Sequence, residues 1–338
     1  MSFFVASFYL SFPSHTFYNN LKGTFVRGER MMNDQIAKLK GSIEQRIVGK
    51  GEVIDRIITA LLAGGHVLLE DVPGVGKTSL AKALADSLAL SFSRIQCTPD
   101  TMPSDITGIS IYNKDTGAFQ VMPGPVMSNI VLADELNRTS PKTQSALLEV
   151  MEEHKLTIDG TSYPVPEPFM VIGTQNPAEM AGTYPLPESQ LDRFMMKLSV
   201  GYPEAEASKE MAKRFLDGDL HMETSAVLTG QNICDMKQEV SKVSVHSNLL
   251  SYASEIVDAT RNKSEISVGA SPRALLSMIR CSQAIAYLAD RDYCIPEDIE
   301  GAAELTLPHR LILTSEAKLS RITGTDLLKD ILKKVKAQ

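Results

Sequence analysis

The sequence predicts an α/β domain followed by a helical domain, and three observations lead to this prediction. First, an apolar run at Val67–Leu69, a turn rich in glycine and proline, and a helical pattern from Thr78 to Leu90 follow one another, as they do around a phosphate-binding loop. Second, apolar strands and helices alternate as far as Val200, as an open parallel sheet with crossover helices requires. Third, every periodic segment after Pro203 is helical.

These patterns divide the chain into residues 33–203, the predicted α/β domain, and residues 204–338, the helical domain, joined at Gly201-Tyr202-Pro203. Residues 1–32 form a separate extension that is crowded with Phe and Tyr and lacks a helical or strand period. The purine-rich codons of Gly28-Glu29-Arg30 resemble a ribosome-binding site, so one interpretation is that translation begins at Met31 or Met32. The alternative is an ordinary extension that packs its aromatic side chains.

Composition narrows the class of protein. The 338 residues are 43% hydrophobic and 22% charged, which is typical of a globular protein with a large core. The net charge of −7 without a basic block argues against nucleic acid as a partner. The four scattered cysteines favour a reducing, cytoplasmic setting over a disulfide scaffold or zinc site, and no apolar stretch is long enough to span a membrane.

Each element of the α/β domain has its own signal. Apolar side chains at helical spacing predict a helix over residues 36–47 and a second over 53–62, and Pro141 begins a helix that extends to Glu153. Turn residues between short alternating runs predict two β-hairpins, at 109–121 and 155–165. Apolar runs predict further buried strands at 91–97, 129–133 and 169–174. The helices predicted in the second domain are 205–216, 232–240, 249–260, 272–289, 296–307 and 325–336.

The turn after the first strand is a phosphate-binding loop ending in Gly76-Lys77-Thr78. Backbone N–H groups at the start of the following helix favour anionic oxygens, Lys77 is expected to contact the β- and γ-phosphates, and the Thr78 hydroxyl is expected to bind Mg²⁺. Asp71 stands where the strict pattern has glycine, and aspartate tolerates turn geometry. The predicted nucleotide contacts are Val72, Pro73, Gly74, Val75, Gly76, Lys77, Thr78 and Ser79.

A pair of carboxylates, Asp134 and Glu135, ends the buried strand that follows. In a phosphate-loop enzyme, such a pair binds Mg²⁺ and polarises the attacking water. We therefore expect Asp134 to bind the metal through water and Glu135 to act as the general base. In isolation the pair is more typical of a solvated strand end, but its place downstream of the loop favours catalysis.

Three further side chains are candidates. Asn176 follows the next buried strand and is expected to reach the γ-phosphate and the water. Arg193 precedes an apolar strand, where an arginine more often forms a surface ion pair. Arg273 lies in the first turn of a helix capped by Ser271, where it either closes over a bound nucleotide or is merely a surface charge.

Several motifs together are similar to those of the MoxR family of AAA+ ATPases, and the resemblance covers residues 33–335. They are Ile47-Val48-Gly49, Gly74–Thr78, Asp134–Arg138 with Pro141–Glu149, Gly173–Pro177, Gly182–Phe194 and Gly269–Ala274, with Arg291–Tyr293, Pro296–Asp298 and His309-Arg310 further on.

The resemblance implies an AAA+ P-loop NTPase core with a parallel five-stranded sheet in the order 5-1-4-3-2, flanked by helices and carrying both hairpins as inserts. It also implies an all-α lid domain and assembly into a ring, usually a hexamer. By position, Lys77 and Thr78 match Walker A, and Asp134 and Glu135 match Walker B. Asn176 matches sensor 1, Arg193 the arginine finger and Arg273 sensor 2, while Ile47, Val48 and Gly49 match the adenine pocket.

For function, the resemblance implies Mg²⁺-dependent ATP hydrolysis that remodels or activates partner proteins, often proteins with von Willebrand A domains. A magnesium-chelatase-type motor subunit is the main alternative, since it shares both inserts. A σ54-type activator is disfavoured, because the Gly-Ala-Phe-Thr-Gly-Ala order and a helix-turn-helix are absent from the sequence. A non-enzymatic scaffold is disfavoured by the intact Lys77, Asp134 and Glu135. The identity of the remodelled protein cannot be read from the sequence.

Overall fold

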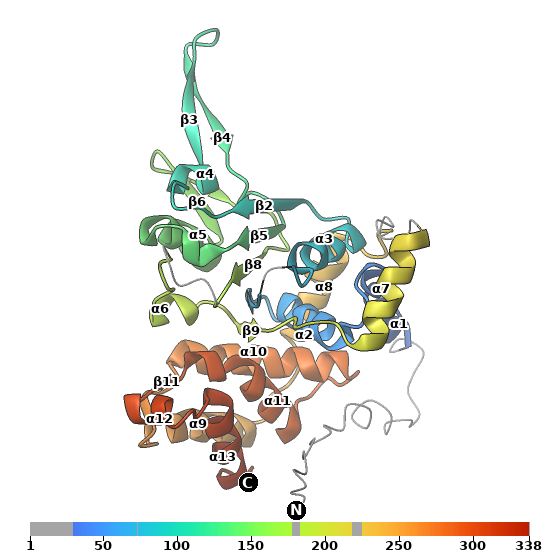
Figure 1. The fold of residues 1–338 in the computed structure, drawn as a ribbon, viewed down its shortest axis with the longest axis vertical. Coiled ribbons are helices and arrows are strands. Elements are labelled where there is room, and N and C mark those ends of the chain that lie inside the picture. The colour runs from blue at the N-terminus through green and yellow to red at the C-terminus, as the bar shows by residue number, and fades with distance from the viewer. Residues whose placement is uncertain (1–29, 73, 178–182, 218–224, 338) are drawn as a thin grey trace, which may run out of the picture.

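The computed structural model describes residues 30–72, 74–177, 183–217 and 225–337. An α/β core occupies the middle of the molecule, a helical domain lies along one side of it, and one β-hairpin projects from the opposite side (Figure 1). The predictions made for the N-terminal extension and for Pro73 lie outside the described residues. In the described part of the chain, no helix is both long enough and apolar enough to cross a membrane.

The core is built on a five-stranded parallel sheet with the order β2-β5-β8-β1-β9. If only the strands of this sheet are numbered along the chain and the sheet is read from β9 to β2, the order is 5-1-4-3-2, as predicted. The strands are β1 (Val67–Glu70), β2 (Phe92–Gln96), β5 (Ile130–Asp134), β8 (Met170–Gln175) and β9 (Met196–Leu198). The residues predicted for Walker A, Walker B and sensor 1 all lie at or just beyond the carboxyl ends of the three central strands, which meet at one edge of the sheet.

The sheet is buried on both faces, and alternate residues of each central strand belong to different clusters of the core. On β1, Val67 and Leu69 pack on the face that carries the first helices, whereas Leu68 packs on the other face. On β5, Leu132 belongs to the first cluster and Val131 to the second. This period of two, with apolar side chains on both faces, is what a parallel strand between two layers requires.

Helices cover the two faces of the sheet. Before the first strand come α1 (Arg30–Arg46) and α2 (Gly51–Leu62), and α3 (Lys77–Ser87) follows it. The other layer contains α5 (Pro141–Glu153), whose Leu147, Leu148 and Met151 are buried as predicted. Shorter helices connect the strands: α4 (Pro103–Thr107), the 3₁₀ turn η1 (Leu136–Arg138) and α6 (Glu188–Leu191).

Both predicted hairpins are present. The strands β3 (Gly108–Asn113) and β4 (Ala118–Pro123) pair in antiparallel fashion and project from the body (Figure 1). The shorter hairpin consists of β6 (Lys155–Ile158) and β7 (Thr161–Pro164). On the projecting hairpin, Phe119 is 74% exposed and its ring meets Tyr112 edge-on at 5.4 Å between centroids.

The helical domain follows the predicted boundaries closely. Its helices are α7 (Ala205–Asp217), α8 (Gly230–Val240), α9 (Ser247–Arg261), α10 (Pro272–Leu288), α11 (Pro296–Thr306), α12 (Ser315–Leu319) and α13 (Gly324–Lys334), with the 3₁₀ turn η3 (Pro308–Arg310). The prediction of an all-α domain was wrong in one detail, because β10 (Ile266–Val268) pairs with β11 (Ile312–Leu313). Strands this short carry no periodic signal in the sequence.

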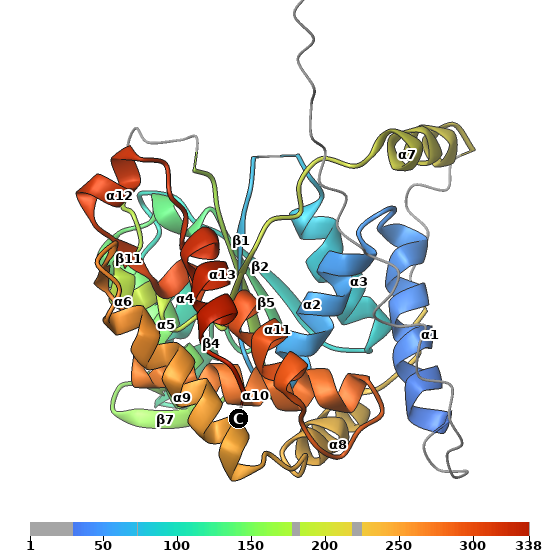
Figure 2. The same ribbon diagram turned by 90° about the horizontal axis from the view of Figure 1, so that it is seen from below.

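One apolar cluster extends from the core into the helical domain. It includes residues of α1, α2 and α3 as well as residues of α8 to α11 and α13, and α2 packs directly against α8 and α10. Figure 2 shows α2 next to the red and orange helices of the second domain. The boundary near residue 203 therefore crosses a shared core, and its position stays a prediction.

Candidate functional site

The phosphate-binding loop has the backbone that its glycines predict. Gly74 and Gly76 have φ values of +86° and +89°, in the left-handed region that glycine adopts at little cost. Gly76 is the N-cap of α3, so Lys77 and Thr78 begin that helix. The first N–H groups of α3 thus lie at the loop, where they favour an anion.

Lys77 is buried and its Nζ donates to the backbone oxygen of Asp71 at 2.9 Å. The lysine is therefore held inside the loop that it is predicted to serve. In the described part of the chain, the neighbouring Thr78 hydroxyl has no hydrogen-bond partner, so it is available to a metal ion or a phosphate oxygen.

Asp71 does more than tolerate the turn. Its buried carboxylate accepts hydrogen bonds from the Ser199 hydroxyl at 3.1 Å, from the Val200 N–H, and from the Gly201 N–H at 3.2 Å. These residues follow β9 and lead out of the core. Asp71 is not among the residues with positive φ, so glycine is not needed here, and the aspartate connects the phosphate-binding loop to the linker.

The same linker is also bound by Lys50, which follows the predicted adenine-pocket residues. Its Nζ donates to the backbone oxygens of Val200, Gly201 and Tyr202 at 2.6, 3.0 and 2.9 Å. Gly49 has a φ of +71°, and a Cβ at this position would lie 2.7 Å from the Cβ of Ala207 in α7. The segment 47–50 is therefore packed tightly against the start of the helical domain.

The two carboxylates at the end of β5 are held by different partners. Asp134 is buried, accepts from the Thr174 hydroxyl at 2.7 Å, and forms an ion pair with Arg94 at 2.6 Å. The backbone N–H of Glu135 donates to the same hydroxyl at 2.8 Å, so Thr174 on β8 fixes both residues.

Glu135 has a left-handed backbone, with a φ of +57°, which is uncommon for a residue other than glycine. Its carboxylate accepts from the Gln96 amide at 3.0 Å and forms an ion pair with Arg138 at 3.0 Å. Cys97 lies behind this pair, and burial, together with the charges of Asp134 and Glu135, raises the pKa of its thiol to about 12. The thiol therefore stays protonated at neutral pH.

Asn176 is buried one residue beyond β8. Its backbone oxygen accepts from the Asn137 amide at 3.5 Å, and β8 pairs with both β5 and β1. The sheet therefore brings Asn176 to the same edge as Lys77, Asp134 and Glu135, as the sequence predicted.

Arg193 and Arg273 lie elsewhere. Arg193 forms an ion pair with Glu152 at 3.1 Å and donates to the Leu148 oxygen at 2.8 Å, and Arg273 pairs with the same Glu152. These residues line a pocket together with Gly64 and Gly65, which precede β1. The phosphate-binding loop follows β1, whose four residues span about 13 Å. In this structure Arg273 does not lie beside the chain's own phosphate-binding loop, since α10 docks at the opposite edge of the sheet. Its role toward a nucleotide stays a prediction.

The helical domain holds the segment that carries Arg193. Arg310 is buried, forms an ion pair with Asp192 at 2.9 Å, and donates to the oxygens of Asp192 and Phe194, both at 2.9 Å. Ser271 donates to the Asp192 carboxylate. Burial, opposed by the charge of Asp192, lowers the pKa of Arg310 to about 10, so the guanidinium stays charged at neutral pH.

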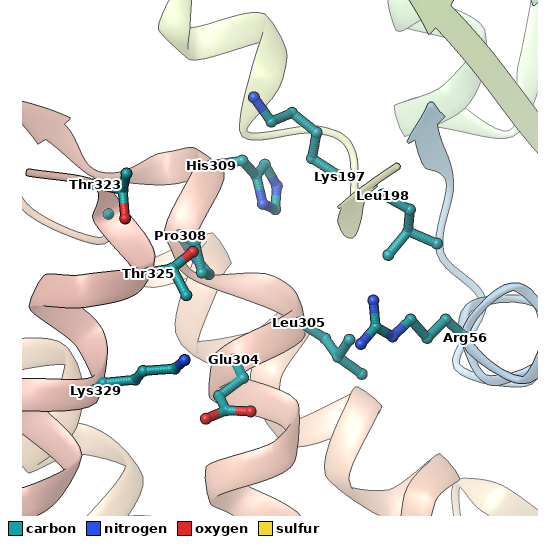
Figure 3. A pocket seen from close by; sticks show the side chains of 11 residues that line it. Arg56, Lys197, Leu198, Glu304, Leu305, Pro308, His309, Thr323, Thr325 and Lys329 are labelled. Carbon is teal, nitrogen blue, oxygen red and sulfur yellow. The ribbon is translucent and has the colours of Figure 1, made fainter. Parts of the chain in front are cut away.

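His309 contacts the oxygen of Phe194 at 3.0 Å. Burial and the charge of Arg310 lower the pKa of His309 to about 3, so it is neutral and its Nε2–H donates to that oxygen. His309 also lines a separate pocket of about 460 Å³ between α2 and β9 on one side and α11 and α13 on the other (Figure 3). Two basic side chains there are already paired, Arg56 with Glu52 and Lys197 with Glu70.

Several residues of the site were missed by sequence reasoning: Arg94, Gln96, Arg138 and Thr174 around the carboxylates, and Lys50, Glu152 and Ser199 further away. Arg94 and Gln96 could have been found, because the predicted strand order puts their strand beside the one that ends in Asp134 and Glu135. Glu152 could not, since its contacts depend on how the helical domain docks.

Comparison with known proteins identifies the family of the two domains. Residues 66–196 match the model of the ATPase family associated with various cellular activities (AAA), and residues 258–331 match the AAA lid domain. The chain is 48% identical to the uncharacterized protein YeaC of Bacillus subtilis over 303 residues, covering 89% of this chain and 94% of YeaC. It is 40% identical to chaperone MoxR1 of Mycobacterium tuberculosis over 302 residues, covering 87% and 80%.

A solved structure, that of a putative ATPase from Cytophaga hutchinsonii, matches with a TM-score of 0.86 and 40% identity, covering 92% of this chain and 97% of that one. A magnesium-chelatase subunit ChlI homolog from Methanocaldococcus jannaschii is more distant, at 26% identity over 54% of this chain and 50% of the homolog.

Proposed function

Because the chain belongs to the MoxR family of AAA+ ATPases, we propose that it hydrolyses ATP in a ring of identical subunits and uses the energy to remodel a partner protein. The observation that carries the proposal is the separation of the predicted catalytic groups. Lys77, Asp134 and Glu135 lie at one edge of the sheet, and Arg193 and Arg273 at the other.

At the first edge, the residues have the chemistry that ATP hydrolysis needs. The N–H groups at the start of α3 and the Lys77 ammonium bind the phosphates, and the Glu135 carboxylate accepts the proton of the attacking water. Gln96 and Arg138 orient that carboxylate. Asn176, at the same edge, positions the water. The Ile47–Gly49 segment provides the wall for the adenine.

The residues also fit a magnesium ion. Thr78 offers a free hydroxyl and Asp134 offers a buried carboxylate fixed by Thr174, and hard oxygen ligands of this kind, together with substrate phosphates, are those that Mg²⁺ prefers. When bound, the ion neutralises charge on the phosphate oxygens. Arg94, which pairs with Asp134, holds the carboxylate in place.

The second edge of the sheet, which carries Arg193 and Arg273, contributes to the active site of a neighbouring subunit. A subunit that presents arginines at one end and a nucleotide at the other makes head-to-tail contacts, and such contacts close into a ring when the rotation allows. Arg193 and Arg273 then both act on the nucleotide of the adjacent subunit. In other phosphoryl-transfer enzymes, an arginine supplied by a second molecule raises the rate of hydrolysis by about 10³–10⁵. The isolated subunit is therefore nearly inactive. We expect a hexamer, as in related rings.

The projecting hairpin supports a protein as the substrate. The hairpin projects from the body (Figure 1). It carries exposed apolar side chains, namely Ile109, Ile111, Tyr112, Phe119 and Met122, and apolar patches of this kind mark interaction surfaces. A von Willebrand A domain protein is the partner that we propose to test first. No observation on the described residues favours the chelatase alternative, and we propose a cytoplasmic location on the strength of four free cysteines.

The proposal is tested by mixing two inactive variants. Arg193→Ala and Glu135→Gln subunits are each expected to be nearly inactive alone. In a mixed ring, an Arg193→Ala subunit keeps its Glu135 and receives Arg193 from a Glu135→Gln neighbour, so partial ATPase activity is expected to return. Wild-type specific activity is expected to rise with protein concentration. If verified mixed rings stay inactive and wild-type activity does not depend on concentration, the shared site is refuted.

A further inference from the structure

The pocket beside Arg193 and Arg273 contains more positive charge than its contacts neutralise. It has a volume of about 170 Å³ and is lined by three arginines, Arg193, Arg273 and Arg280, and by one carboxylate, Glu152. Glu152 forms ion pairs with both Arg193 and Arg273. One carboxylate therefore faces three guanidinium groups.

Arg280 is the least explained of the three. In the part of the chain that the structure describes, it has no hydrogen-bond or ion-pair partner, and it is exposed. Arg273, Ser277 and Arg280 are spaced by four and three residues on α10, so they share one face of the helix, and Arg273 and Arg280 are separated by about 10 Å of helix. Two turns of α10 thus present cations to the same pocket.

Of the two histidines in the pocket, His66 adds no charge to this balance at neutral pH. His66 accepts from the Val171 N–H at 3.0 Å and contacts the Met151 oxygen at 3.1 Å, and burial lowers its pKa to about 4. His154 is paired with Glu167. The net charge of the lining is therefore positive, and a group with several anionic oxygens is the ligand that complements it.

We propose that this pocket is a phosphate-binding site for the nucleotide held by the neighbouring subunit, that Arg280 is its third cation, and that Glu152 is the internal anion that occupies it in the free subunit. The inference rests on the proposed shared site and adds two residues to it. Planar guanidinium groups bind carboxylate and phosphate oxygens with the same fork geometry, which is why one anion can replace the other.

The replacement is easy because both ion pairs are accessible to water, with side chains that are 30–42% exposed. Two such ion pairs correspond to roughly a 2- to 30-fold change in an equilibrium constant. A polyphosphate carries several charges and meets three arginines, whereas Glu152 carries one charge and meets two. Glu152 therefore keeps the arginines in place before assembly and opposes assembly only weakly.

The first test is Glu152→Gln, with Glu153→Gln as the matched control. Glu153 is the exposed neighbour on the same helix and has no partner in the described structure. Removing the competing charge is expected to lower, by about 2- to 30-fold, the protein concentration at which ATPase activity is half-maximal, while the control leaves it unchanged. A Glu152→Gln variant that needs the same or a higher concentration overturns the role of Glu152 as a competing anion.

The second test is Arg280→Gln, with Arg280→Lys as the conservative variant and Arg321→Gln, on an exposed turn of the same domain, as the control. ATPγS-dependent ring formation, measured by sedimentation, is expected to weaken in Arg280→Gln and to recover in part in Arg280→Lys. Binding of a fluorescent ATP analogue by the isolated subunit stays unchanged. If the Arg280→Gln variant forms rings as readily as the wild type, Arg280 is not the third cation.

These outcomes are separable from those of the shared-site proposal. If mixing Arg193→Ala with Glu135→Gln restores activity while Glu152→Gln and Arg280→Gln behave as wild type, the shared site stands and this inference fails. If mixing restores nothing, the shared site itself has failed.

Discussion

Replacing Asp71 by glycine makes the phosphate-binding loop match the strict sequence pattern, yet we expect it to weaken the protein. The change removes a buried carboxylate that accepts from Ser199, Val200 and Gly201. A hydrogen bond to a charged group contributes about 1.5–3 kcal/mol, and a buried N–H left without a partner costs about 1–3 kcal/mol. Since such terms do not add fully, we take the total loss as about 4 kcal/mol.

This loss of unfolding free energy corresponds to a decrease in the melting temperature, Tm. With an unfolding entropy of about 2.1 cal/mol/K per residue, a loss of about 4 kcal/mol lowers Tm by roughly 6–11 °C for a cooperative unit of about 170–300 residues. Asp71→Asn, which keeps one acceptor oxygen, is expected to fall between the glycine variant and wild type.

Circular dichroism of the nucleotide-free protein measures the change. Asp100→Gly, at an exposed turn, controls for the flexibility that glycine adds to the unfolded chain. Ser199→Ala, alone and combined with Asp71→Asn, completes a double-mutant cycle, and the two changes are expected to be non-additive. A Tm for Asp71→Gly within about 1–2 °C of that of Asp100→Gly, or strict additivity in the cycle, would refute the reasoning.

Three other predictions concern the catalytic groups and pH. Lys77→Ala is expected to abolish binding of a fluorescent ATP analogue, whereas Glu135→Gln keeps binding and loses about 10²–10⁴ in turnover; equal losses of affinity would contradict the separate roles. Gly76→Ala, at a φ of +89°, is expected to lose nucleotide binding because an L-residue is strained there, and unchanged affinity would contradict the loop geometry. The pKa values of His66 and His309 are lowered to about 4 and about 3, so both side chains stay neutral in the folded state, whereas in the unfolded chain they bind protons below about pH 6.5. The free energy of unfolding is therefore expected to fall as the pH drops from about 6.5 toward 4, by up to about 1.4 kcal/mol per pH unit for each histidine. Tm measured across this range is expected to fall less steeply in His309→Gln, and an unchanged slope would exclude His309 as a cause.

The sequence predicted the fold well where its signals are local. The apolar runs of β5 and β8, the turns of both hairpins and the capped start of α10 each lie within a few residues of their predicted positions. The strand order came from the family resemblance, since periodicity alone does not order strands. The pairing of β10 with β11 joins Ile266 to Leu313, and contacts so distant in sequence leave no local pattern.

The site was predicted in part for the same reason. Glycines, lysine and carboxylates of the loop and of β5 follow from spacing, and the structure gathers them at one edge of the sheet. Arg273 was expected beside the chain's own nucleotide because its helix belongs to the second domain, and only the docking of that domain decides which edge it meets. The roles of these residues stay predictions until they are tested. Asp71 looked like a tolerated exception in the sequence, because its three partners follow β9, 128 to 130 residues later.

The continuous apolar cluster has a practical consequence for anyone who cuts this chain into pieces. A fragment that ends near residue 203 would leave the buried side of α2 in water, and a fragment that begins there would expose α8 and α10 in the same way. Apolar surfaces of that kind make fragments aggregate. We therefore expect the two halves of the molecule to fold well only when they are expressed together as one chain.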